Sequence, residues 1–206
     1  MLDRGFFARD TVSVARDLVG CLLDVDAGSA THVVARLVEV EAYLGLKDPA
    51  SHAFRGPTPR AAIMFEEPGH LYVYFSYGMH HCANIVTEPR NTAGAVLLRA
   101  ALVEVGEDVV RARRGTPASR DALLRGPGNL CRGLGITLLD NDSDVCKPTA
   151  RISVLPRDSA PPITVSPRVG ISAAADRALR FSWTGCAAVS TPRPRPQLTG
   201  TKKGTG

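Results

Sequence analysis

The stretch R-L-V-E-V-E-A-Y-L-G, residues 36–45, decides the fold. It continues an apolar run and predicts a strand over residues 33–42, in which side chains two positions apart share a face. On that alternation Glu39 and Glu41 lie on an otherwise apolar face, and the opposite face is also mainly apolar. The face of the two glutamates also carries Val33, Ala35, Leu37 and Tyr43. A strand that is apolar on both faces is usually buried on both, so each carboxylate needs a partner or a chemical use.

The two carboxylates allow two interpretations. Buried charges are often structural, and a basic partner for each glutamate would then only order the core. Carboxylates in buried surroundings are also typical of catalytic acids and bases. A glycoside-hydrolase pair needs carboxylates on either side of its substrate, whereas Glu39 and Glu41 are neighbours on one strand face. We therefore expect Glu39 to be structural.

Length and composition predict a globular protein with a sizeable core. The 206 residues fit one large domain or two small ones, and 44% of them are hydrophobic. No apolar run reaches the ~20 residues that span a bilayer, and charges interrupt the N-terminus where a signal peptide is apolar. We expect a cytoplasmic protein with no membrane partner. The five cysteines form no C-x-x-C pair, so neither a disulfide framework nor a zinc site is indicated.

Charge is distributed unevenly along the chain. Residues 1–100 have a net charge of −2, whereas residues 101–206 have a net charge of +7. A basic half favours a polyanionic partner, nucleic acid first. A solvated basic face with no partner explains the same numbers.

The pattern of apolar and turn residues predicts the elements in outline. We expect a helix from residue 11, capped by Asp10 and stopped by Gly20, and a second helix over residues 103–114. Strands are expected at 21–25, 33–42, 71–76 and 80–86 and around Arg99, with short strands over 150–190. Residues 46–70 form a long Pro/Gly-rich loop of the kind that is often functional. The basic tail, residues 191–206, is expected to be disordered.

Several separate motifs together resemble one family. They are G-F-F-A-R-D, V-E-V-E-A-Y-L-G, A-S-H-A-F-R-G-P-T-P-R, G-H-L-Y-V-Y-F-S-Y-G-M-H-H-C-A-N-I-V, V-L-L-R-A, G-P-G-N-L-C-R-G-L-G-I and R-V-G-I. In this order, over residues 5 to 171, the sequence resembles the alkyladenine (3-methyladenine, methylpurine) DNA glycosylases. The resemblance implies an α+β fold in residues 1–190, a single mixed domain with a curved, largely antiparallel β-sheet and flanking helices. It also implies base flipping and excision of alkylated purines from double-stranded DNA in base excision repair, without lyase activity.

The resemblance carries roles onto individual residues. It implies that Glu41 is the general base and that Arg99 beside it helps to hold the attacking water. It implies a base pocket formed by Tyr43, His52, Tyr74 and Asn84, with Asn84 helping to exclude guanine. Tyr77 would enter the minor groove in place of the flipped nucleotide, and Arg55 and Arg60 would contact DNA phosphates.

The chemistry of an alkylated purine explains these residue types. The base is cationic, so aromatic walls attract it and it leaves without an acid. One ionised carboxylate then suffices to orient water and stabilise the sugar cation, and Arg99 would keep Glu41 ionised. Lys47 is the single lysine in the first hundred residues, so a Schiff-base lyase mechanism is not expected. No cofactor is indicated, and a monomer is expected.

Two departures from the family pattern and two rival functions remain. Pro57 stands where relatives often have an arginine, and R-F-S-W-T-G-C-A-A-V-S, residues 180–190, differs enough that no pocket-closing residue carries over. The rivals are a non-catalytic nucleic-acid-binding module and a hydrolase of free nucleosides. His70, His80 and His81 could suggest a metal site with Glu41, but no H-x-x-x-H or H-E-x-x-H spacing supports one.

Overall fold

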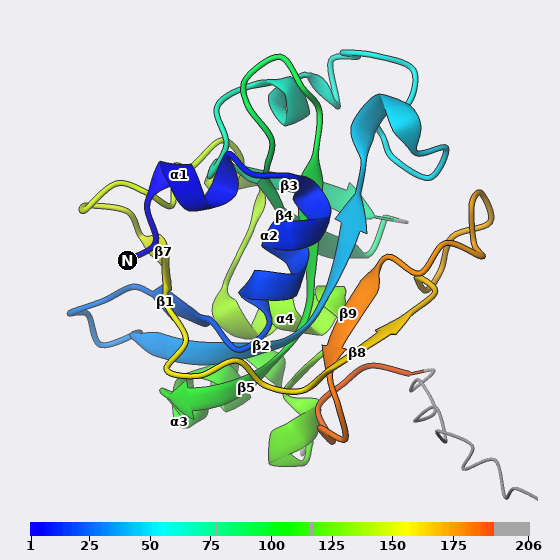
Figure 1. Cartoon of the computed structure of the whole chain (residues 1–206). Helices are drawn as coiled ribbons and strands as arrows, with labels where there is room; N and C mark the ends of the chain where they lie inside the picture. Colours follow the sequence, from blue (N-terminus) through cyan, green and yellow to red (C-terminus); the bar gives the residue numbers. More distant parts are fainter. Residues whose placement is uncertain (77, 116–117, 192–206) are drawn as a thin grey trace, which may run out of the picture.

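The computed structural model describes residues 1–76, 78–115 and 118–191 (Figure 1). Tyr77, predicted to enter DNA, and residues 192–206 of the predicted tail lie outside the described residues. The predicted domain boundary at residue 190 therefore stays a prediction.

The strands and helices follow one another in a mixed order along the chain. The helices are α1 Arg4–Phe7, α2 Thr11–Leu18, α3 Glu107–Arg114 and α4 Pro127–Leu134, with short 3-10 turns at Gly45–Lys47, Ala62–Phe65, Arg120–Ala122 and Leu138–Asp140. The strands are β1 Leu22–Val25, β2 Val33–Tyr43, β3 Leu71–Ser76, β4 His80–Val86, β5 Ala95–Val105, β6 Leu124–Arg125, β7 Ile152–Leu155, β8 Ile163–Ser166 and β9 Arg180–Trp183.

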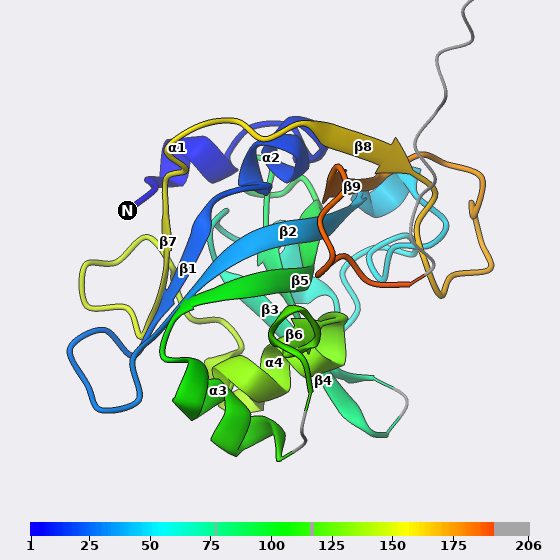
Figure 2. The same cartoon turned by 90° about the horizontal axis from the view of Figure 1, so that it is seen from below.

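The strands of the described residues form one nine-stranded sheet, with the main order β3-β4-β5-β2-β1-β7. Strand β6 adds to β5, β9 adds to β2 and β8 adds to β9, and all of these pairings are antiparallel. Figure 2 shows β2 and β5 running between α2 on one side and α3 and α4 on the other. The predicted α+β fold with a curved, largely antiparallel sheet is confirmed.

Strand β2 changes partners halfway along its length. Its first residues, 33–36, pair with β1, whereas residues 39–41 pair with β9 on the same side, and β5 lies along the other edge. Every residue from 37 to 42 is buried. The predicted burial on both faces is confirmed, and it results from this change of neighbour.

Two opposed bulges alter the alternation expected for Glu39 and Glu41. In the first bulge β2 has one extra residue, Val38, between its pairings with Ala101 and Ala100 of β5. In the second bulge β5 has one extra residue, Arg99, between its pairings with Glu39 and Val40 of β2. A bulge switches which side chains face a given side of the sheet. Accordingly Leu37 and Val40 both pack in the main core. Placing the glutamates on the face of Leu37 was therefore wrong, because that face assignment assumed an unbroken alternation.

Helix α2 confirms the first predicted helix. The Asp10 side chain accepts a hydrogen bond of 2.9 Å from the backbone N–H of Ser13, which caps the helix start. The second prediction started four residues too early, because β5 continues through Val105, paired with Val34. Gly106 then adopts a left-handed conformation (φ 80°), and α3 begins at Glu107.

The long loop of residues 46–70 folds against the far end of the sheet. Its Ala53, Ala61 and Met64 pack with Tyr72 and other residues of β3–β5 in a second, smaller core. This packing turns the loop into a wall beside β3. In the described ranges no helix is long and apolar enough to cross a membrane.

Candidate active site

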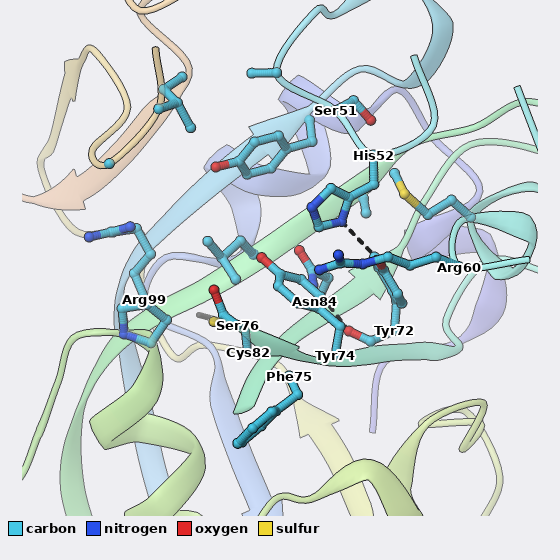
Figure 3. A pocket seen from close by; sticks show the side chains of 18 of the residues that line it. Ser51, His52, Arg60, Tyr72, Tyr74, Phe75, Ser76, Cys82, Asn84 and Arg99 are labelled. Atoms are coloured by element: carbon cyan, nitrogen blue, oxygen red, sulfur yellow. Dashed lines mark hydrogen bonds between the residues drawn. The ribbon is translucent and has the colours of Figure 1, made fainter. Parts of the chain in front are cut away.

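A cavity of about 560 Å³ opens beside the end of β2, within the size range of small-ligand sites. Figure 3 shows side chains from the loop, from β3 and β4 and from β5 converging on it. Its lining comprises Tyr43, Ala50, Ser51, His52, Arg60, Met64, Tyr72, Tyr74, Phe75, Ser76, Cys82, Asn84, Ala95, Leu97, Arg99, Pro127, Val169, Gly170 and Ile171. The lining includes five residues that were predicted for the base pocket or the catalytic centre, namely Tyr43, His52, Tyr74, Asn84 and Arg99. It also includes Arg60, which was predicted to contact DNA phosphates.

One wall of the cavity is a cluster of three rings. Tyr72 and Tyr74 project from the same face of β3, with ring centroids 5.2 Å apart. The loop residue His52 meets the ring of Tyr74 edge-on at 4.8 Å, and its Nδ1 lies 2.9 Å from the hydroxyl of Tyr72. Burial and the nearby Arg60 lower the pKa of His52, which keeps its ring neutral at pH 7. The result is a π-rich surface whose three rings are themselves neutral.

Tyr43 is held from behind by a buried ion pair. The guanidinium carbon of Arg168 lies 4.6 Å from the centroid of the Tyr43 ring. Arg168 Nη2 donates to Asp48 at 2.8 Å and Nη1 to the carbonyl of Ala42 at 2.9 Å, and the side chains of both Arg168 and Asp48 are 0% exposed. Burial and the adjacent Glu41 strongly raise the pKa of Tyr43, so its hydroxyl stays protonated.

Glu41 lies directly behind the cavity wall. Its side chain is 0% exposed and is not part of the lining, but three lining residues surround its carboxylate. Val169 N–H donates to Oε1 at 2.8 Å and the Tyr43 hydroxyl donates to Oε2 at 3.0 Å. Arg99 Nη1 lies 3.4 Å from Oε2, longer than an ordinary hydrogen bond. A carboxylate offers about four lone-pair positions, so Glu41 keeps acceptor capacity on the side of Arg99.

Glu39 is saturated by comparison. Its Oε1 accepts from Arg99 Nε at 2.8 Å, from Arg180 Nε at 2.7 Å and from the hydroxyl of Ser190 at 2.8 Å. Its Oε2 accepts from the backbone N–H of Ser190 at 2.6 Å. All four residues are buried. The C-terminal segment around Ser190 therefore closes over Glu39, and the expected structural role of this glutamate fits its contacts.

The two environments separate the pKa values of the two glutamates. For Glu41 burial is the largest effect and raises the pKa, against the lowering effect of Arg99. Glu39 is buried as deeply, but Arg99 and Arg180 with the two Ser190 donors lower its pKa. Neighbouring carboxylates whose pKa values move apart are typical of sites where one ion is structural and the other takes or gives a proton.

Asn84 lies on β4 in the floor of the cavity and is 4% exposed. Its side-chain N–H donates to the backbone carbonyl of Tyr72 at 3.0 Å. This bond fixes the amide orientation. An edge of the amide on the cavity wall is the kind of group that can distinguish purines by their exocyclic substituents.

The two loop arginines predicted to contact phosphates differ in position. Arg55 is exposed and is not part of the cavity lining. Arg60 lines the cavity, and its guanidinium carbon lies 4.8 Å from the centroid of the Tyr74 ring. The predicted contacts of both arginines with DNA phosphates stay predictions.

No metal centre is formed by the part of the chain that the structure describes. No group of three His, Cys, Asp or Glu side chains there is placed to hold an ion. His70 Nδ1 instead lies 2.8 Å from Asp142 Oδ1. His80 and His81 line a separate cavity beside α4.

Three features of the site were not predicted. Tyr72 was missed although it shares the strand face of Tyr74, a period-two signal that was available. The Arg168–Asp48 pair and the position of Ser190 join residues more than a hundred positions apart. No local pattern indicates such contacts.

Comparison with known proteins places the chain in a family. The family model of methylpurine-DNA glycosylase (MPG) matches residues 5–187. A Corynebacterium jeikeium protein named "Putative 3-methyladenine DNA glycosylase" is 50% identical over 173 residues, covering 79% of this chain and 81% of that protein. Proteins of the same name from Nocardia farcinica and Mycobacterium sp. are 46% and 44% identical, covering 93% and 91% of this chain and 91% and 92% of their own lengths. The chain therefore belongs to the methylpurine-DNA glycosylase family.

Proposed function

We propose that the protein is a monofunctional DNA glycosylase that hydrolyses the N-glycosyl bond of 3-methyladenine-type purines in duplex DNA and leaves an abasic site. The observation that carries this proposal is Glu41, a buried carboxylate of raised pKa directly behind an aromatic cavity. Family membership and the names of the relatives support the substrate class.

The cavity suits a flipped, alkylated base. A base in a duplex must be rotated out before its sugar can be attacked. Tyr43 on one side and His52 and Tyr74 on the other offer π-faces that favour an electron-poor, cationic ring. Asn84 then reads the exocyclic edge of the base and disfavours guanine.

Glu41 would activate the attacking water. The base leaves as a neutral molecule once the bond to its cationic form breaks, so the reaction needs a nucleophile rather than an acid. Water held between Glu41 Oε2 and Arg99 would reach the sugar from the Tyr43 side of the cavity. The raised pKa of Glu41 makes it a stronger base than an exposed glutamate, and its buried anion stabilises an oxocarbenium-like sugar.

Arg99 would tune this carboxylate without neutralising it. Its Nε is bound to Glu39, and the long 3.4 Å approach of Nη1 to Glu41 leaves the anion reactive. No lysine lies among the described residues that line the cavity. Hydrolysis without a Schiff base is therefore the chemistry that this lining supports.

Contacts with the duplex would come from the surface around the cavity mouth. We assign Tyr77, which follows Ser76 in the sequence, to the space left by the flipped nucleotide, a role that unchanged flipping kinetics in Tyr77→Ala would reject. Arg55 and the basic second half of the chain would attract phosphates. We expect a monomer in the cytoplasm, at the nucleoid in a bacterial cell, and light scattering measures the oligomeric state.

One incubation distinguishes this proposal from its two rivals. The purified protein is mixed with a duplex that contains one 3-methyladenine and, separately, with a free alkylated nucleoside. Base release from the duplex alone, with the abasic strand left uncut, supports a monofunctional glycosylase. Binding without release supports a non-catalytic DNA-binding module, and release from the free nucleoside supports a nucleoside hydrolase.

A further inference from the structure

Arg60 lines the cavity in which the proposed function places the flipped base. Figure 3 shows its side chain reaching from the loop into the cavity beside His52 and Tyr74. The guanidinium is planar and cationic, and it lies 4.8 Å from the centroid of the Tyr74 ring. A purine alkylated at a ring nitrogen is also planar and cationic, and it would seek the same aromatic face.

Arg60 is not held in this position by a carboxylate. The charged residues of the cavity lining are Arg60 and Arg99, and Arg99 is paired with Glu39 and Glu41. Among the described residues Arg60 forms no ion pair, and its contacts there are with the ring of Tyr74 and the hydroxyl of Tyr72. The residue is exposed, and its long side chain can leave for solvent at little cost in buried contacts.

On the opposite wall of the cavity, Arg168 is buried and paired with a carboxylate. Arg168 also stacks on a tyrosine of the cavity, but it is 0% exposed and its charge is compensated by Asp48. The charge behind Tyr43 is therefore balanced by Asp48, whereas the guanidinium of Arg60 over Tyr74 has no carboxylate partner among the described residues. The two walls of the cavity therefore differ in the burial and the pairing of their arginine.

We propose that Arg60 is a specificity-determining residue that occupies the cation site of the base pocket in the free protein and leaves it when a cationic base enters. This inference rests on the proposed function, because it takes the flipped base as the occupant. Two positive groups cannot share the face of Tyr74 without repulsion in a partly desolvated cavity. A neutral base, in contrast, can stack on Tyr74 or on Arg60 itself. Arg60 therefore reduces the preference of the pocket for cationic over neutral bases.

The test uses two probes that differ by one methyl group and one charge. 3,9-Dimethyladeninium is cationic, and 9-methyladenine is neutral; neither has a sugar or a phosphate, so contacts with the DNA backbone cannot contribute. Calorimetry gives the ratio of the two dissociation constants for the native protein, Arg60→Gln and Arg55→Gln. We expect Arg60→Gln to increase the preference for the cation about tenfold.

Arg55→Gln is the matched control, because it removes the same charge from the same loop outside the cavity. Its ratio should stay within twofold of the native one. An unchanged ratio in Arg60→Gln, or an equal increase in Arg55→Gln, would overturn the proposal. Nuclear magnetic resonance of the arginine side chains gives a second measurement. The ring-current shift of Arg60 should vanish in Tyr74→Leu and on saturation with the cation, and a shift that persists with the cation bound contradicts displacement.

Failure of this inference and failure of the proposed function give different results. A native protein that releases 3-methyladenine from DNA, with no change of selectivity in Arg60→Gln, keeps its function and loses the role of Arg60. A protein that releases no base, with the expected change of selectivity, keeps a cation site controlled by Arg60 and loses the glycosylase assignment.

Discussion

Glu39 and Glu41 lie two residues apart on β2, yet they stand in opposite kinds of surroundings. Glu39 accepts four hydrogen bonds, from two guanidinium groups and from Ser190, in the closed part of the sheet beneath the C-terminal segment. Glu41 accepts two hydrogen bonds and faces a cavity across Arg99 and Tyr43. The same side chain at equal depth is therefore the centre of an ion-pair network in one place and an under-compensated carboxylate in the other.

The difference shows how one strand can hold a saturated and an under-compensated carboxylate side by side. The hydrogen bond to Glu39 holds Arg99 in place. In that position Arg99 Nη1 stays 3.4 Å from Glu41, beyond an ordinary hydrogen bond. The bulge in β5 makes this possible, because Arg99 is the extra residue that has no partner on β2. Bulges next to active sites re-aim side chains in this way.

Removing the charge of Glu39 should have the largest effect on stability. Glu39→Gln leaves Arg99 and Arg180 buried without their shared anion, and breaking a buried ion pair from one side typically costs about 3–5 kcal/mol. Urea denaturation at pH 7 measures the free energy of unfolding. A loss under ~1 kcal/mol, the size typical of an exposed pair, would show that Glu39 is not the centre of this ion-pair network.

Ser190→Ala should have an intermediate effect. The change removes the hydroxyl that donates to Glu39 and accepts from Arg99 Nη2 at 3.1 Å, but it keeps the backbone N–H. We expect a loss of about 1–2 kcal/mol in the free energy of unfolding. Ser29→Ala, in an exposed turn, is the matched control and should change stability little. Equal effects of the two changes would remove Ser190 from the network.

The same neutralisation at Glu41 should cost no stability at pH 7. A folded-state pKa above the ordinary value means that ionisation of Glu41 opposes folding, so protonated Glu41 favours the native state. The stability of the native protein relative to Glu41→Gln should therefore be greatest below the ordinary glutamate pKa of 4.5 and fall as the pH rises through the raised pKa. Unfolding curves from pH 4 to 8 measure this difference, and a relative stability that rises with pH would reverse the assigned direction.

The smallest expected effect is on the pH dependence of the excision rate, whose decrease on the acidic side should lie at a higher pH than for an ordinary glutamate. Excision needs ionised Glu41, so the rate should fall as the pH decreases through a pKa above the ordinary 4.5 of a glutamate. Single-turnover rates on the 3-methyladenine duplex at saturating protein give the profile. An acid limb below pH 4.5 would place the titrating group elsewhere.

The parts of the fold that could be predicted are those that depend on local pattern. The cap at Asp10, the hairpin of β3 and β4 and the long buried strand β2 follow from neighbouring residues. The faces of Glu39 and Glu41 could not be assigned, because the two bulges are properties of strand pairing between residues about sixty positions apart. Period-two reasoning holds only while both strands stay in register.

The site divides in the same way. Motifs that match a known family indicated Glu41, Tyr43, His52, Tyr74, Asn84 and Arg99, and the structure places Glu41 behind the cavity that the other five line. Arg60 was expected at the DNA backbone, and its place over Tyr74 depends on how the loop folds against β3. The anchors of Tyr43 and Glu39 come from Arg168 and Ser190, which only the folded chain brings near.

The most direct test of the account is single-turnover excision by Glu41→Gln, with binding to the lesion duplex measured on the same preparation. The substituted amide keeps the size and the acceptor oxygen of the side chain but cannot take a proton from water. We expect binding within about threefold of the native protein and a rate of base release lower by about 10²–10⁴-fold, the usual range for loss of a general base. A variant that folds, binds and still excises within about tenfold of the native rate would contradict the role of Glu41.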